Sequence, residues 1–293
     1  MAKVRIGVIG GSGFYRMDAL TDAEELQIDT PFGKPSGDIV VGTLDDERVA
    51  FLPRHGPGHS ILPHELPARA NIYALKSLGV ELIVSVSAVG SLRKEIEPLH
   101  LVAPDQVIDR TRGRPSTFFG EGFVAHIAFA DPFCPELRAA LVASAREAGA
   151  TVHNGGAYVA VEGPAFSTRA ESNLYRSWGA DVIGMTALPE AKLAREAEIC
   201  YAILACATDF DCWHTGEADV TAEMIVANLQ KNVAVSQEAV RLFLRRWPQE
   251  RRCDCRSALA NAIVTPFDLV PPATMAKLDL LIGKYVQAAR MAG

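Results

Sequence analysis

Short runs of apolar, mostly β-branched residues recur along the chain and alternate with segments of helical spacing. The apolar runs predict buried strands over residues 4–9, 49–52, 82–86, 101–107, 158–161, 181–183 and 199–205. Apolar residues with helical spacing occupy residues 137–145 and 225–244. This alternation predicts an α/β layered fold, with a central mixed sheet flanked by helices and functional loops at the strand ends.

We expect a single domain over residues 1–293. No internal repeat or low-complexity linker divides the chain, and the cluster of Pro266, Pro271 and Pro272 precedes only one more helical segment, at about residues 273–291. That segment is too short to form a core of its own. We therefore expect it to dock on the parent domain.

Composition limits the classes of partner. The chain has 293 residues, of which 49% are hydrophobic and 22% charged, as in ordinary globular proteins. Its net charge of -6 leaves no excess of Lys and Arg to neutralise nucleic-acid phosphates. The first apolar run is too short for a signal peptide or a membrane span, so we expect a cytoplasmic protein with no nucleic-acid or membrane partner.

The cysteines do not follow a metal-binding pattern. They are Cys134, Cys200, Cys206, Cys212, Cys253 and Cys255. The last two form a single Cys-x-Cys without the second pair that zinc motifs have. We therefore predict no metal site and, in the cytosol, reduced thiols.

Three loops suited to an anion follow three of the predicted strands. Ser12 lies among glycines that can present backbone N–H groups. Arg54 and His55 follow the second strand, where a guanidinium fork would suit phosphate oxygens, and Ser87 ends the third. Each loop alone could be a solvated turn, but the three together favour one shared anion site. The first loop fits neither a dinucleotide fingerprint nor a P-loop.

Two carboxyl groups follow the last predicted strand. In an extended chain Asp209 and Asp211 would point to the same side. Burial and mutual repulsion would then raise the pKa of one of them and make it a general acid. Phe166, just before a helix start capped by Ser167 or Thr168, is a candidate for stacking on a base. A solvated loop and a core phenylalanine are the simpler alternatives.

Several segments carry a resemblance to one known family. They are residues 9–15 (IGGSGFY), 53–56 (PRHG), 69–76 (RANIYALK), 90–93 (GSLR), 109–111 (DRT), 162–164 (EGP) and 185–186 (MT). Over nearly its whole length the chain resembles the trimeric purine nucleoside phosphorylases, and among them the 5′-methylthioadenosine phosphorylases. The resemblance implies a nucleoside phosphorylase-like fold, a homotrimer or a dimer of trimers, and no metal or organic cofactor.

The activity that the resemblance implies is phosphorolysis of S-methyl-5′-thioadenosine to adenine and 5-methylthioribose 1-phosphate, with inorganic phosphate as co-substrate. The implied phosphate site consists of Ser12, Arg54, His55, Ser87, Ala88 and Thr186. The ribose would lie by the backbone of Met185, and the purine would stack near Phe166 with Ser167 close by. A protonated Asp209 would donate to N7, and Asp211 would support the 6-amino group.

The same resemblance implies an apolar pocket for the 5′ substituent. Ala222, Ile225 and Val226 would form it, and His126 would arrive from a neighbouring subunit. Ile225 also fits the apolar stripe of its own helix, so a core role is the alternative. At Gly184 the chain departs from the eukaryotic members, which typically have Asn there.

The Cys253-x-Cys255 pair resembles thermostable archaeal members of the family. In those members cysteines of this region form disulfides. The resemblance thus makes the redox state of these cysteines a question for experiment.

Other functions remain open at this point. A broader purine nucleoside phosphorylase acting on adenosine, inosine or guanosine would share the fold. A nucleoside- or phosphate-binding sensor would keep the pocket without turnover. A dinucleotide-dependent oxidoreductase is disfavoured because the fingerprint fails.

Overall fold

The computed structural model of the protein describes residues 4–10, 19–214, 221–247 and 250–292. Its strands are β1 (Ile6–Gly10), β2 (Thr21–Leu26), β3 (Ile39–Leu44), β4 (Glu47–Pro53), β5 (Leu82–Ser91), β6 (Leu101–Ala103), β7 (Gln106–Arg110), β8 (Val152–Asn154), β9 (Ala157–Val161), β10 (Val182–Gly184) and β11 (Cys200–Asp209). Its α-helices are α1 (Ala68–Ser77), α2 (Pro135–Glu147), α3 (Arg169–Ser177), α4 (Ala187–Glu196), α5 (Ala222–Arg246) and α6 (Pro272–Ala292). Short 3₁₀ helices are η1 (Pro57–His59), η2 (Asp211–Trp213), η3 (Asp254–Ser257) and η4 (Phe267–Leu269).

The strands form one mixed sheet, in agreement with the predicted α/β fold. β1 lies between β4 and β5 and is parallel to both. β11 runs parallel to β5, from Cys200 opposite Leu82 to Ala207 opposite Val89. The carboxyl ends of β1, β4, β5 and β11 therefore lie at the same edge of the sheet, where α/β proteins bind ligands. β10 is antiparallel to β5, with Ile183 opposite Gly90, and so reaches the same region.

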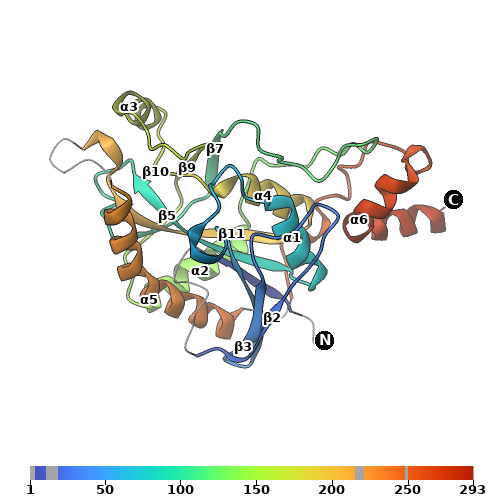
Figure 1. Cartoon of the computed structure of the whole chain (residues 1–293), viewed down its shortest axis with the longest axis horizontal. Coiled ribbons are helices and arrows are strands. Elements are labelled where there is room, and N and C mark those ends of the chain that lie inside the picture. Colours follow the sequence, from blue (N-terminus) through green and yellow to red (C-terminus); the bar gives the residue numbers. More distant parts are fainter. Residues whose placement is uncertain (1–3, 11–18, 215–220, 248–249, 293) are drawn as a thin grey trace.

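Helices cover both faces of this sheet (Figure 1). Successive residues of β11 point to opposite faces: Tyr201 and Ile203 pack in the core formed with α1, α4 and α6, whereas Cys200 and Leu204 pack in the core formed with α2 and α5. Because both faces are covered, β11 is buried along its whole length. The strand thus gives the residues at its two ends a fixed position.

Several details differ from the sequence-based expectations, and β3 and β8 are among the strands that were not predicted. The single strand expected over residues 101–107 is divided into β6 and β7, because Pro104 between them has no N–H to donate to the ladder. β2 was missed because its residues are polar and exposed, so they show no apolar alternation. In the described part of the chain, no helix has the length and apolar character needed to cross a bilayer.

Candidate active site

A cavity of about 400 Å³ opens where the ends of β4, β5 and β11 meet the start of α5. Thirteen of the expected site residues line it: Arg54, His55, Ser87, Ala88, Phe166, Ser167, Met185, Thr186, Asp209, Asp211, Ala222, Ile225 and Val226. Ser12 lies outside the described residues. His126 does not line the cavity of this chain; it is exposed, and its backbone N–H donates to Ala262 O over 2.8 Å.

Arg54 is only 1% exposed, and other parts of the chain already hold its guanidinium. Nε donates to Glu190 Oε1 over 2.6 Å, and Nη1 donates to Val86 O over 2.9 Å. Nη2 donates to Ser85 Oγ over 2.7 Å and to Ile9 O over 3.3 Å. A guanidinium has five N–H groups, so among the described residues only one Nη1–H has no acceptor. Glu190, Ser85 and main-chain carbonyls thus hold most of the guanidinium, and one N–H is left for an anion.

Glu190 balances the charge of Arg54 inside the protein. Its side chain, on α4, is buried, and Oε2 accepts hydrogen bonds from Tyr201 Oη at 2.9 Å and Ser85 Oγ at 3.3 Å. These partners satisfy a carboxylate that would otherwise be costly to bury. The cavity floor thus carries a neutral ion pair, and uncharged donors must supply much of the hydrogen bonding to an anion.

Ser87 and Thr186 are such donors. Ser87 Oγ is buried and has no hydrogen-bond partner among the described residues. Thr186 is the N-cap residue of α4, yet its side chain caps no backbone N–H of that helix. Leu188, two residues further on, has φ -119° and ψ 140°, so the regular turns of α4 begin beyond Thr186. The two hydroxyls are the donors here that suit a phosphate.

His55 is a buried, neutral imidazole. Its Nδ1 lies 2.9 Å from Ile61 O, and because a carbonyl only accepts, Nδ1 carries the proton. Burial, with the positive charge of Arg54, lowers the pKa of His55 to about 4. The ring stacks on His59 with 4.1 Å between centroids. Nε2 is therefore left as a hydrogen-bond acceptor in the resting protein.

Asp209 ends β11 with its carboxyl held on both oxygens. Oδ2 accepts from Thr208 Oγ1 at 2.8 Å, and Oδ1 accepts from the backbone N–H of Asp211 at 2.8 Å. Only 4% of Asp209 is exposed. The expectation of an extended segment is wrong, because Asp211 has φ 51° and begins η2. The turn, and not strand alternation, brings the two carboxyl groups to one cavity.

Burial raises the pKa of Asp211. The Ser172 hydroxyl approaches this carboxyl group and acts against that rise, and Oδ2 is buried. One oxygen of the carboxyl group is thus turned into the protein. Since Asp211 lines the cavity, a bound base is a suitable partner.

Two glycines give the cavity its shape. A Cβ on Gly90 would lie 3.0 Å from Asp209 Oδ1 and 3.3 Å from Asp211 Cβ, so a side chain there would press on both carboxyl groups. A Cβ on Gly184 would lie 2.0 Å from Tyr158 Oη. The space that an Asn side chain would need at Gly184 is therefore occupied by the tyrosine ring and its hydroxyl.

The remaining walls suit a base and an apolar group. Phe166 is 47% exposed and lines the open side. The backbone at Met185 is held by Arg114, whose Nη1 donates to Met185 O over 2.7 Å. The first turns of α5, which begin after the N-cap Thr221, add Leu229 and Val233 to the three residues expected there. The start of α5 thus gives the cavity an aliphatic wall.

A family model decides the identity. The model of the phosphorylase superfamily matches residues 5–245 of the chain. The chain belongs to the phosphorylase superfamily. Among similar members is the S-methyl-5′-thioadenosine phosphorylase of Geobacter sulfurreducens, which is 59% identical over 282 residues, covering 96% of this chain and 99% of that one. The enzyme of the same name from Thermofilum pendens is 50% identical over 264 residues, covering 90% of this chain and 100% of that one.

Solved structures agree with this membership. A methylthioadenosine phosphorylase from an antarctic soil metagenomic library has a TM-score of 0.91 and 50% identity to this phosphorylase, covering 95% of this chain and 99% of that one. The Schistosoma mansoni methylthioadenosine phosphorylase in complex with adenine has a TM-score of 0.82 and 34% identity, covering 96% and 98%. The family resemblance seen in the sequence is confirmed.

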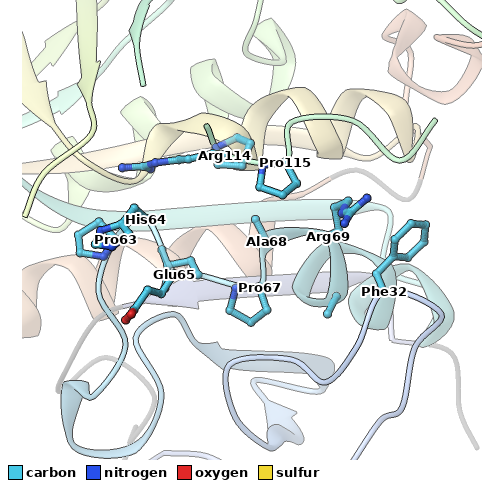
Figure 2. Close-up of a pocket in the computed structure, with 12 residues that line it drawn as sticks. Phe32, Pro63, His64, Glu65, Pro67, Ala68, Arg69, Arg114 and Pro115 are labelled. Carbon is cyan, nitrogen blue, oxygen red and sulfur yellow. The ribbon is translucent and has the colours of Figure 1, made fainter. Parts of the chain in front are cut away.

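A second cavity, of about 300 Å³, adjoins the first in this phosphorylase and shares Pro63 with it. Figure 2 shows Arg114 and Pro115 on one side of this cavity, across from Glu65 and Pro67. Arg114 donates from both Nη atoms to backbone carbonyls, those of Met185 and Leu188 among them. The second cavity thus lies against the arginine that fixes the backbone of the main site.

Sequence reasoning missed the residues that support the site. Glu190, Arg114 and Tyr158 act through contacts with segments far away along the chain, and their sequence neighbourhoods contain no recognisable motif. Glu190 gave no distinct signal, because α4 also carries the charged residues Lys192, Arg195 and Glu196. Its burial and its cation follow only from the packing of the helix on the sheet.

Proposed function

We propose that the chain cleaves S-methyl-5′-thioadenosine with inorganic phosphate, forming adenine and 5-methylthioribose 1-phosphate. Relatives at 50% identity or more over most of the chain bear the name S-methyl-5′-thioadenosine phosphorylase, which supports this substrate. The observation that carries the proposal is that Arg54, Thr186 and Asp209 line one cavity. This shared lining supports the proposal that an anion site and a carboxyl group act on opposite sides of one glycosidic bond.

The phosphate end of the cavity stabilises the sugar as the bond breaks. Departure of the purine leaves positive charge on the ribosyl carbon, which a phosphate held beside it offsets. Ser87 Oγ, the Thr186 hydroxyl and the one unused N–H of Arg54 would hold that phosphate. Because these donors are fixed beforehand, little reorganisation is needed. Direct attack inverts C1′ without a covalent enzyme intermediate.

Asp209 is the side chain that we assign to protonate N7 of the departing purine. Thr208 and the backbone N–H of Asp211 fix its orientation. Asp211, which also lines the cavity, would accept from the 6-amino group. A general acid of this kind contributes about 10²–10⁴-fold to the rate. The carboxyl pair suits a 6-aminopurine, which presents an acceptor at N7 and a donor at C6.

The remaining residues of the cavity would bind the ribose, the base and the 5′ substituent. The ribose would lie by the Met185 backbone, and the base against Phe166 with Ser167 nearby. The 5′-methylthio group would lie among Ala222, Ile225 and Val226, whose aliphatic side chains exclude water from an apolar substituent.

We infer a cytoplasmic homotrimer or dimer of trimers, with phosphate as co-substrate and no other cofactor in the reaction. In that assembly His126 of a neighbouring subunit would complete the 5′ end of the site. His126 is exposed in the single chain, as this role requires. Light scattering measures the assembly, and His126→Ala should raise KM for the nucleoside while leaving KM for phosphate unchanged.

Product analysis with and without phosphate tests the reaction. We expect adenine and 5-methylthioribose 1-phosphate only when phosphate is present; adenine formed equally well without phosphate would indicate a hydrolase and refute the proposal. Adenosine, inosine and guanosine are assayed in parallel. A higher kcat/KM for inosine would favour the broader purine nucleoside phosphorylase, and binding without product would favour a sensor.

A matched pair of serine variants tests the anion site. Ser87→Ala removes the buried hydroxyl that has no partner among the described residues and should raise KM for phosphate about tenfold. Ser144→Ala is the control. Ser144 is also buried but lies in α2, so this substitution should leave KM for phosphate unchanged. Equal effects of the two substitutions would remove Ser87 from the phosphate site.

A further inference from the structure

Four of the six cysteines meet at one point in the fold. Cys134 is the N-cap residue of α2, Cys200 is the first residue of β11, and Cys253 and Cys255 lie at the start of η3. Their Sγ atoms all lie within 4.8 Å of one another, and those of Cys200 and Cys253 are 3.3 Å apart. We call these four residues the cysteine cluster. Three separate segments of the chain contribute to it.

The spacing of the sulfur atoms suits a tetrahedral metal ion. In a zinc site with four cysteines, Zn–S bonds of about 2.3 Å place the sulfur atoms about 3.8 Å apart. Four Sγ atoms that all lie within 4.8 Å of one another need only small rotations to surround such an ion. Soft thiolate ligands in this number and geometry select Zn²⁺ over Mg²⁺ or Ca²⁺.

Burial indicates a structural and not a catalytic site. Cys134, Cys200 and Cys255 are 1%, 0% and 5% exposed, and Cys253 is half-buried. The cluster lies in the core between the sheet and helices α2 and α5. Four protein ligands in a closed pocket leave no coordination position for water or substrate, which is the arrangement of structural zinc sites.

The surroundings offset the charge that such a site would carry. Four thiolates and one Zn²⁺ sum to a charge of about −2. Arg251 Nη1 lies 4.0 Å from Cys200 Sγ and donates to it, while the same atom donates to Glu81 O and Glu198 O. Cys134 lies at the positive end of the α2 dipole. A guanidinium and a helix N-terminus thus face the sulfur atoms.

We propose that Cys134, Cys200, Cys253 and Cys255 bind one Zn²⁺ as a structural site. The four thiols release their protons on binding, and no electron is transferred. The ion ties the segment after α5 to the starts of α2 and β11. Cys200 and Asp209 are at opposite ends of the ten-residue strand β11, about 30 Å apart at the usual rise per residue. The metal therefore takes no part in the reaction proposed above.

This assignment departs from the expectation of no metal. That expectation rested on the absence of a second closely spaced pair in the sequence, and the fold supplies the pair as Cys134 and Cys200. Disulfides, as in the archaeal relatives, would use the same sulfur atoms. The two outcomes differ in metal content and in the number of free thiols.

Metal analysis of the full-length protein tests the proposal. The protein is purified under reducing conditions, dialysed and analysed by inductively coupled plasma mass spectrometry; we expect about one zinc per chain. Cys255→Ala should lower the zinc content about tenfold or more. Cys206→Ala is the matched control, because Cys206 is buried in β11 but contacts Ser236 outside the cluster. Loss of zinc in both variants would overturn the assignment.

Cobalt replacement keeps the test decisive even if a variant fails to fold. Wild-type protein stripped of metal and loaded with Co²⁺ should show strong thiolate-to-cobalt charge-transfer bands and the visible bands of a tetrahedral site. Binding of zinc should raise Tm without changing kcat. Disulfides found by mass spectrometry in reduced preparations, a weak octahedral cobalt spectrum, or free thiols with no bound metal would each overturn the proposal.

Discussion

The backbone N–H of Asp211 donates to Oδ1 of Asp209 over 2.8 Å, so the turn that follows β11 fixes the carboxyl group at the end of that strand. Gly90 faces the same oxygen with no side chain, which allows the close approach. The orientation of the proposed acid thus depends on a main-chain donor that a substitution at Asp211 leaves in place.

Asp209→Asn should lower kcat/KM for S-methyl-5′-thioadenosine by about 10²–10⁴-fold, because an amide cannot deliver a proton to N7. Its preference should shift toward 6-oxopurines, since an amide can donate to O6. Asp211→Asn keeps the main-chain hydrogen bond to Asp209 and should lose less activity. Steady-state kinetics with matched 6-amino and 6-oxo nucleosides measure both effects. An unchanged substrate profile in Asp209→Asn would exclude Asp209 from the role.

His55 makes stability depend on pH. Its pKa is lowered from 6.5 to about 4 in the folded protein, so between these values the unfolded chain binds a proton that the folded protein does not. The His55 contribution is therefore lost as pH falls through this window, by about 2 kcal/mol at about pH 5. Denaturant unfolding at about pH 7.5 and 5 should show this loss in the wild type and a smaller one in His55→Asn.

The Asn variant is a suitable comparison because its Nδ2 can still donate to Ile61 O in place of the imidazole Nδ1. It lacks the Nε2 position, so KM for phosphate should rise while KM for the nucleoside changes little. Equal pH sensitivity in His55→Asn and wild type would show that other groups cause the acid destabilisation.

Glu190→Gln should leave Arg54 without its counter-charge. Breaking one side of a buried ion pair costs about 3–5 kcal/mol, and Arg54 and Glu190 have side-chain exposures of 1% and 3%. A bound phosphate would then be the nearest negative charge, so phosphate should raise Tm more in this variant than in the wild type. Thermal melts with and without phosphate measure the difference.

Glu196→Gln provides the control for that experiment. Glu196 is buried on the same helix, accepts hydrogen bonds from Thr117 Oγ1 and the Phe118 N–H, and has a pKa raised to about 7 by burial. Neither of these partners is a cation. Phosphate should therefore raise the Tm of Glu196→Gln no more than it raises the Tm of the wild type. Equal phosphate responses in both glutamine variants would contradict the charge argument.

Gly184→Ala should destabilise the protein by about 1–3 kcal/mol through overpacking. The added Cβ would lie 2.0 Å from Tyr158 Oη and 2.7 Å from Tyr158 Cζ. Tyr158→Phe alone should cost about 1 kcal/mol, because the Tyr158 hydroxyl lies within reach of Thr186 and of the Ala187 N–H. The double variant should recover part of the loss, which a double-mutant cycle measures. Full wild-type stability of Gly184→Ala would refute the packing argument.

The position of the site could be predicted from the sequence because parallel strands end at one edge. Arg54, Ser87 and Asp209 each follow or end an apolar run, and the fold brings those ends together. The motif at residues 185–186, which the chain shares with the family, likewise predicted Thr186 and Met185. Local patterns were sufficient for these residues because each lies at a strand end or a helix start.

The pairings across the core could not be predicted. Which carboxylate meets Arg54 depends on how α4 packs on the sheet, and α4 is far from β4 in the chain. The turn at Asp211 was missed because a left-handed φ at an aspartate leaves no mark in an apolar pattern. The cysteine cluster was missed for a related reason: ligand spacing along the chain indicates a metal site only when the ligands are local.

The ion pair between Arg54 and Glu190 has a consequence for how phosphate enters. Because the guanidinium charge is already balanced, a dianion would bring excess negative charge into a buried cavity that also holds a neutral His55. Uptake of a proton from the solvent by the imidazole Nε2, or binding of the dihydrogen phosphate monoanion in place of the dianion, relieves that excess. The heat released when phosphate binds should therefore change with the ionisation enthalpy of the buffer.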